Sequence, residues 1–229
     1  VLSSAEKDFA PEGYRLRIDS KTVSIAASTK AGAFYGIQTL RKSLPHLSEK
    51  ERAYMSKNGR IALPGVDIND APRFAYRGTM LDVARHFATA DSVKRFIDMI
   101  ALHGINRMHW HLTDDQGWRI EIKQLPELTK IGSHRSATVI GKNTGKYDGK
   151  PHGGFYTQEQ CKDIIAYAAA RNIVIIPEID LPGHMLAALA AYPHLGCTGG
   201  PYEVGQIWGV SSDVLCAGNP QTYEFIDKV

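Results

Sequence analysis

The stretch that decides the fold covers residues 173–184 and reads IVIIPEIDLPGH. Four consecutive β-branched residues predict a fully buried β-strand, and the prolines and the glycine end it. Two acids and a histidine follow within a few positions, at Glu178, Asp180 and His184. One interpretation is a strand end followed by a turn and a helix cap. We expect instead a rigid polar site, because the prolines and the glycine restrict the backbone there.

The same alternation of strands and helices occurs before this stretch. Residues 78–83 predict a second buried strand, and residues 105–112 predict a third. The connecting segments have helical spacing or a capping box, at Val93–Ile100 and from Thr157 to about Arg171. Gly104 ends the first helix, and a short helix is expected at 184–192. The pattern predicts a parallel α/β fold built of successive βα units of a barrel.

The pattern of apolar residues before residue 73 is different and predicts a small α+β segment over residues 1–72. Alternation over residues 14–26 predicts two short strands, and residues 31–44 predict a helix. Its expected buried face carries Phe34, Ile37 and Leu40. Residues 45–72 are expected to be a connection with one strand near Ile61. Residues 73–229 are expected to hold the βα units.

Composition excludes several classes of protein. Of the 229 residues, 43% are hydrophobic and 22% are charged, as in globular proteins rather than disordered ones. The net charge of +3, with both signs scattered, argues against nucleic acid as a partner. No apolar run approaches the ~18 residues that a membrane helix needs.

The chain lacks an initial Met, and Asn219 and Pro220 open a helix near its last residue. We interpret both ends as cuts in a longer protein; a short terminal helix is the alternative for the second.

Polar side chains gather where each predicted strand ends. The barrel interpretation brings them to one rim, where loops build the active sites of such barrels. They are Asp82, Arg85 and His86 after the first strand, His109, His111, Thr113, Asp114 and Asp115 after the second, and Glu178, Asp180 and His184 after the third.

Several of these residues have more than one interpretation. His109 and His111 face the same way on a strand and are either hydrogen-bonded core histidines or a metal pair with Asp180 or His184 as further ligands. Asp115 is a loop residue that could pair with Arg119. Arg85 forms either a surface ion pair or a contact to the hydroxyl groups of a ligand.

At this point the motifs resemble a known family. The segments LDVARHF (81–87), NRMHWHLTDDQGWR (106–119) and PEIDLPGH (177–184) resemble glycoside hydrolase family 20, the β-N-acetylhexosaminidases. GGFYT (153–157) and LCAGN (215–219) resemble its bacterial members. The resemblance covers about residues 11–229. Residues 11–45 are similar to the end of the small α+β domain that precedes the barrel, and residues 73–229 are similar to the first three to four βα units of a (β/α)8 barrel.

The resemblance implies a retaining hydrolase of terminal β-linked N-acetylhexosamine, in which the acetamido oxygen of the sugar attacks the anomeric carbon. It implies that Arg85 binds sugar hydroxyls, and that Asp114 and His184 form a hydrogen-bonded chain to the acid glutamate. Asp180 would line the same pocket. The implied partners are N-acetylhexosamine-terminated glycans, and we expect no cofactor and no metal.

One departure limits this expectation. The Asp-Glu pair of the family lies in a Gly-Gly-Asp-Glu motif, which this sequence does not contain. We therefore expect no turnover by this chain alone. Three or four strands cannot close an eight-stranded barrel, so we also expect the isolated chain to associate or to be poorly soluble.

Two other functions remain open. One is a carbohydrate-binding remnant without chemistry, and the other is a metal-dependent hydrolase using His109 and His111. Cys197 and Cys216 flank a loop of about twenty residues and are either bridged or reduced, whereas Cys161 is expected to be unpaired. A bridge would fit an exported protein, which is the location we expect.

Overall fold

The structure is a computed structural model that describes residues 2–3, 9–44 and 63–229. The chain divides into two compact units. The first comprises residues 1–77 with 100–106, and the second comprises residues 78–99 with 107–229.

The first unit is a four-stranded sheet with one long helix. The strands are β1 (Leu2–Ser3), β2 (Tyr14–Ile18), β3 (Val23–Ala26) and β4 (Val66–Asp70), in the order β1-β3-β2-β4. Helix α1 (Lys30–Ser43) begins at Thr29, whose side chain accepts a hydrogen bond from the Gly32 backbone. The two strands predicted within 14–26 and the helix predicted at 31–44 are confirmed. The strand predicted near Ile61 lies outside the described residues.

The buried face of helix α1 agrees only in part with the predicted one. Phe34 and Leu40 pack against the core of this unit, whereas Ile37 is 44% exposed. The closest approach to the sheet is made by glycine: a Cβ atom on Gly36 would lie 2.6 Å from Cγ2 of Ile25 in strand β3. The prediction was wrong for Ile37 because it followed apolar side chains, whereas the helix approaches the sheet where side chains are missing.

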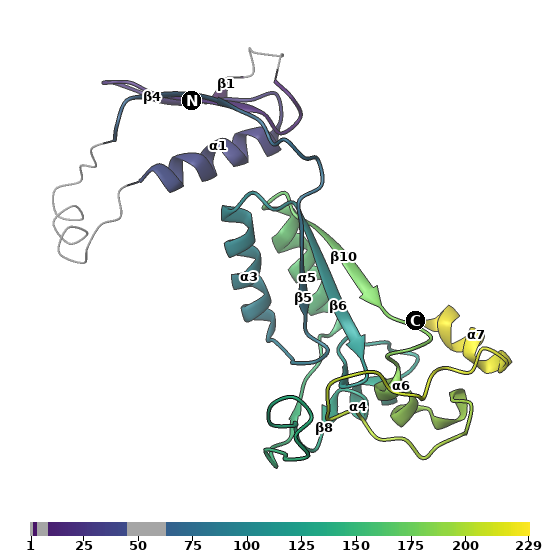
Figure 1. The fold of residues 1–229 in the computed structure, drawn as a ribbon. Coiled ribbons are helices and arrows are strands. Elements are labelled where there is room, and N and C mark those ends of the chain that lie inside the picture. Colours follow the sequence, from purple (N-terminus) through teal and green to yellow (C-terminus); the bar gives the residue numbers. More distant parts are fainter. Residues whose placement is uncertain (1, 4–8, 45–62) are drawn as a thin grey trace. The chain divides into compact units, whose positions relative to one another are not determined.

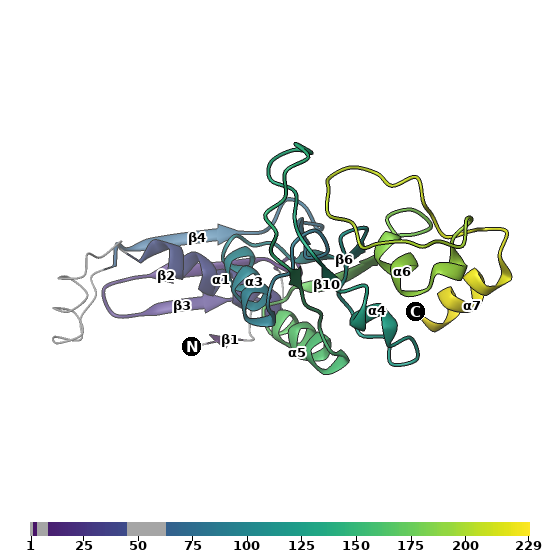
Figure 2. The same ribbon diagram turned by 90° about the horizontal axis from the view of Figure 1, so that it is seen from below.

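The second unit contains a parallel sheet in the order β10-β6-β5. Its strands are β5 (Gly78–Asp82), β6 (Arg107–Asp114) and β10 (Val174–Ile179), and a short strand β7 (Gly117–Trp118) pairs antiparallel with β6. Helices α3 (Ala90–Leu102) and α5 (Gln158–Ala169) connect the parallel strands, and Figure 2 shows them lying near each other. The predicted alternation of strands and helices is confirmed, including the capping box at Thr157 and the left-handed Gly104.

The two faces of this sheet differ. Met108, Trp110 and Leu112 on one face of β6 are buried, and helix α5 packs against β10. On the other face the register aligns Met80, His109 and Ile176 in one row. Met80 is 52% exposed and Val174 is exposed to the same extent, so the prediction of fully buried strands was wrong. Three parallel strands leave open the face that a closed barrel turns inward.

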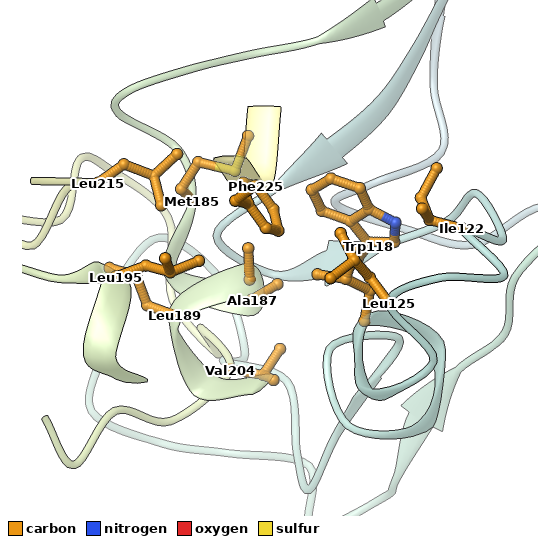
Figure 3. Packing of buried hydrophobic residues seen from close by; sticks show 12 residues of the cluster. Trp118, Ile122, Leu125, Met185, Ala187, Leu189, Leu195, Val204, Leu215 and Phe225 are labelled. Atoms are coloured by element: carbon orange, nitrogen blue, oxygen red, sulfur yellow. The ribbon is translucent and has the colours of Figure 1, made fainter. Parts of the chain in front are cut away.

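Past the carboxyl ends of the strands, loops and short helices enclose a hydrophobic cluster (Figure 3). Trp118 packs there with Met185, Leu189 and Phe225. Its residues come in part from α4 (Glu127–Lys130), α6 (Leu186–Ala191), the 3-10 helix η1 (Pro193–Leu195) and α7 (Pro220–Lys228). A separate antiparallel pair is formed by β8 (His134–Arg135) and β9 (His152–Gly153). The predicted helix at 184–192 and the cap at Asn219 are confirmed. This cluster supports the loops that carry the polar residues.

The three cysteines are unbridged in the structure. The thiols of Cys197 and Cys216 are hydrogen-bonded to each other, and this bond raises the pKa of Cys197. Cys161 is buried, and burial raises its pKa to about 11. Within the described part of the chain, no helix has the length and apolar character needed to cross a membrane.

Candidate active site

The strands β5, β6 and β10 lie side by side in the second unit (Figure 1), and ionisable residues stand at their carboxyl ends. Asp82 at the end of β5, His111 in β6 and Glu178 in β10 are aligned by the strand register. Because aligned residues of parallel strands share a face, these three side chains form one polar row. Asp114, at the end of β6, lies directly beyond it.

Asp114 is the centre of the cluster, and its side chain is 0% exposed. Its Oδ2 atom lies 2.6 Å from Nη2 of Arg85 and 2.9 Å from Nε2 of His111. Its Oδ1 atom accepts from the backbone N–H of Asp115 at 2.7 Å and lies 3.1 Å from Nδ1 of His184. Each carboxylate oxygen therefore has two donors, which is what a buried carboxylate requires.

These donors decide the charge of Asp114. Burial by itself raises the pKa of the carboxyl group, but the hydrogen bond to His111 and the backbone bond from Asp115 outweigh it, together with the charges of Arg85 and His184. The net result is a lowered pKa. Asp114 is thus an anion held inside a ring of donors.

Arg85 is oriented by its own loop. Oδ1 of Asp82 accepts the backbone N–H groups of Ala84 and Arg85, and its Oδ2 lies 2.9 Å from Nη1 of Arg85. The guanidinium therefore bridges Asp82 and Asp114, and about a quarter of its side chain stays exposed. Of the two interpretations of Arg85, the structure shows ion pairs, and they lie in the site rather than at an isolated surface position.

His184 has a left-handed backbone, with φ of 54°. Its Nδ1 faces Asp114 and lies 3.6 Å from Oδ2 of Asp115. Nε2, the second ring nitrogen, has no hydrogen-bond partner among the described residues. The predicted pairing of Asp114 with His184 is thus present, and the other ring nitrogen is available to a further group.

Asp180 is the one predicted site residue that the structure does not bring into this cluster. It is partly buried and forms no hydrogen bond or ion pair with any residue that the structure describes. Two other residues expected at the rim also lie apart. His86 stacks on His152, with ring centroids 4.2 Å apart, and the buried side-chain hydroxyl of Thr113 has no hydrogen-bond partner among the described residues.

His111 and Glu178 form a pair within the cluster that the sequence motifs do not predict. Nδ1 of His111 lies 2.6 Å from Oε2 of Glu178, and His109 hydrogen-bonds to the same oxygen. Burial lowers the pKa of His111, but the hydrogen bonds to Asp114 and Glu178 raise it to about 9. The pKa of Glu178 is lowered: burial opposes the shift, and the bond to His111 outweighs it.

The alternative metal site, in which Asp180 or His184 joins His109 and His111, is not formed. His109 and His111 do converge, but with Glu178 rather than with Asp180 or His184, which groups instead with Asp114 and Asp115. Both ring nitrogens of His111 face carboxylate oxygens. A metal ligand needs a free nitrogen lone pair, so this donor set fits a hydrogen-bonded network of alternating charges better than a metal site.

The expected pair of Asp115 and Arg119 is not formed either. Arg119 is fully buried and donates to backbone carbonyl oxygens, at 2.6 Å to Ser133, 2.7 Å to Ala84 and 3.0 Å to Val83. Burial lowers its pKa to about 10. Asp115 instead accepts the backbone N–H of Leu186, at the start of helix α6, and burial raises its pKa. Arg119 thus holds together the loop that follows β5 and the segment that precedes β8.

Comparison with known proteins identifies the family. The profile described as "Glycosyl hydrolase family 20, catalytic domain" matches residues 74–229, and "Glycosyl hydrolase family 20, domain 2" matches residues 1–71. The chain belongs to glycosyl hydrolase family 20, as the sequence motifs predict.

Named relatives agree with this assignment. The chain is 49% identical over 218 residues to the β-hexosaminidase of Porphyromonas gingivalis, a match that covers 95% of this chain and 26% of that protein. It is 42% identical over 217 residues to the β-hexosaminidase of Vibrio furnissii, covering 94% of this chain and 34% of that protein. The chain therefore spans about a quarter to a third of the length of these relatives.

Solved structures of the family share the fold. The N-acetyl-β-hexosaminidase of Streptomyces plicatus, solved with Thio-NAglucal, is 40% identical with a TM-score of 0.83, and the match covers 99% of this chain and 43% of that one. The family 20 exo-β-N-acetylglucosaminidase of Vibrio harveyi, solved with N-acetylglucosamine, is 38% identical with a TM-score of 0.79 and coverages of 97% and 34%. The predicted fold class, a partial (β/α)8 barrel preceded by a small α+β domain, is confirmed.

Proposed function

We propose that the whole protein containing this chain hydrolyses terminal β-linked N-acetylhexosamine residues of glycans with retention of configuration. The observation that carries the proposal is the convergence of Arg85, Asp114 and His184, from three separate segments, in a chain of glycosyl hydrolase family 20. In the substrate-assisted scheme of this family the acetamido group of the sugar is the nucleophile. The protein then has to bind the sugar and deliver a proton to the leaving oxygen.

Arg85 is our candidate for binding the sugar hydroxyls. Its guanidinium is oriented by two carboxylates and remains partly exposed at the strand ends. A planar fork of donors held in this way can hydrogen-bond two neighbouring hydroxyl groups without losing side-chain entropy on binding. Asp180, which forms no hydrogen bond or ion pair with the described residues, is our candidate for a second polar contact in the same pocket.

Asp114 and His184 are our candidates for tuning the acid. Asp114 is ionised and fixes Nδ1 of His184, which leaves Nε2 available for the carboxyl group of an acid glutamate. A histidine in this position controls the proton affinity of its neighbour through the charge behind it. The acid glutamate and the acetamide-orienting aspartate belong to the Gly-Gly-Asp-Glu motif, which this sequence does not contain.

A chromogenic β-N-acetylglucosaminide tests the proposal. We expect turnover by the full-length protein and none by residues 1–229, because this segment holds the supporting side chains without the Asp-Glu pair. Turnover by the 229-residue segment would contradict our assignment of roles. A full-length protein that binds N-acetylglucosamine without hydrolysing the glycoside would instead support the carbohydrate-binding alternative.

A further inference from the structure

His111 occupies a position that neither the sequence motifs nor the proposed mechanism explains. Its side chain is 5% exposed and lies between two carboxylates on different elements. Nε2 faces Oδ2 of Asp114 at 2.9 Å, and Nδ1 faces Oε2 of Glu178 at 2.6 Å. The imidazole ring therefore connects the end of β6 to β10 inside the site.

The two contacts determine the protonation of the ring. An ionised carboxylate only accepts hydrogen bonds, so each ring nitrogen has to carry a proton if both short contacts are to be favourable. One neighbour opposes this state, since Nη1 of Arg85 lies 3.1 Å from Nε2. Three carboxylates favour it, namely Asp114, Glu178 and the more distant Asp82.

The last neighbour of the ring, His109, lies on the same strand and shares Glu178 with it. Its described polar contact is with that carboxylate rather than with His111. The raised pKa of His111, about 9, is consistent with an imidazolium at neutral pH.

We propose that His111 is a positioning residue of the active site. Its ring is a buried imidazolium that fixes the orientation of the Asp114 carboxylate, and this carboxylate in turn orients His184. The protonated ring donates a hydrogen bond to Oδ2 of Asp114, and Oδ1 of the same carboxylate is then directed at Nδ1 of His184. Glu178 holds the ring from the other side. The catalytic consequence rests on the function proposed above, whereas the protonated state of the ring does not.

The protonation state can be measured without an activity assay. In full-length protein labelled with 15N-histidine, we expect the His111 ring to show two protonated nitrogens at pH 7.5. The signal is assigned by its loss in His111→Gln and, independently, in His111→Asn. A neutral ring with a single N–H at this pH would overturn the proposal, whether or not the protein is a hydrolase.

Kinetics of the full-length protein test the positioning role. We expect His111→Leu to lower kcat by about 10- to 100-fold, with a smaller change in KM, because the substrate contacts are not removed. His111→Gln retains an N–H near Asp114 and should recover part of the loss. The acidic limb of the pH–rate profile should move to higher pH in both variants, since Asp114 loses a cationic neighbour.

His109→Gln is the matched control, because it changes a histidine on the same strand that contacts Glu178 and not Asp114. We expect its pH profile and kcat to stay close to those of the unmodified protein. If His111→Leu matches His109→Gln in both measurements, the positioning role is wrong. If the unmodified protein is inactive on every N-acetylhexosaminide, the proposed function fails, and the histidine labelling still decides the protonation of His111.

Discussion

Asp114 is the residue through which the site is held together, because side chains from three separate segments of the chain contact its carboxylate. It pairs with the guanidinium of Arg85, the ring of His111 and the ring of His184. A buried carboxylate with such partners is costly to remove, since its cationic neighbours remain in place without compensation.

We therefore expect Asp114→Asn in the full-length protein to lower its free energy of unfolding by about 3 kcal/mol and to abolish most of its activity. The measurements are the midpoint of urea unfolding and kcat. Asp98→Asn is the control, since it breaks an exposed ion pair with Arg171 and should cost under about 1 kcal/mol. Equal losses in the two variants would show that burial of Asp114 adds nothing.

His111 links stability to pH. Its pKa is raised from the ordinary 6.5 to about 9 in the folded protein. Its contribution is therefore complete below pH 6.5 and is lost as the pH rises through about 9, an effect on the order of 2–3 kcal/mol. We expect the thermal midpoint of the full-length protein to fall over this range, and His111→Gln to flatten the decline. An unchanged slope in the variant would assign the decline to other groups.

At the scale of the element, helix α1 shows how closely a helix can approach a sheet. Gly32 and Gly36 face β2 and β3 where no side chain fits, and the bulkier Ile37 points away from that contact. We expect Gly36→Val to lower the thermal midpoint by an amount that corresponds to about 1–3 kcal/mol, because the new side chain overlaps Ile25. Lys42→Val, at an exposed position of the same helix, should change it by less than about 1 kcal/mol.

The reactivity of the three cysteines offers a second test at this scale. A cysteine reacts with an alkylating reagent as the thiolate, which is the nucleophile. The buried Cys161, with its pKa of about 11, should therefore be the slowest of the three cysteines to react. We expect iodoacetamide at pH 8 to alkylate Cys197 first, since it is exposed. Mass spectrometry of peptides measures the order, and labelling of Cys161 as fast as Cys197 would contradict the burial shown by the structure.

Elements and site residues were predictable to different degrees. The strands, the capping box at Thr157 and the convergence of polar residues at the strand ends follow from local patterns. The contact of His111 with Glu178 depends on strand register, which local patterns do not encode. The carbonyl partners of Arg119 are also distant in the sequence, and a charged residue nearby suggested the wrong partner.

At the scale of the whole molecule, the open face of the parallel sheet is the main consequence of having three barrel strands. Met80, Val174 and Ile176 expose large apolar side chains there. Apolar area and unpaired strand edges favour association. We expect residues 1–229 alone to form oligomers in light scattering, and Val174→Lys with Ile176→Lys to reduce them. A monomer at concentrations near 100 μM, on the order used for such measurements, would contradict this expectation.

The bonds of Arg119 have a consequence for protein engineering. The guanidinium donates hydrogen bonds to the backbone carbonyl oxygens of Val83, Ala84 and Ser133, and none of these bonds involves their side chains. Loops fixed by their peptide groups can exchange amino acids without losing their anchor. Because Val83, Ala84 and Ser133 are themselves fully buried, a library at these positions should retain folded members only for side chains of similar volume, and only as long as codon 119 is left untouched.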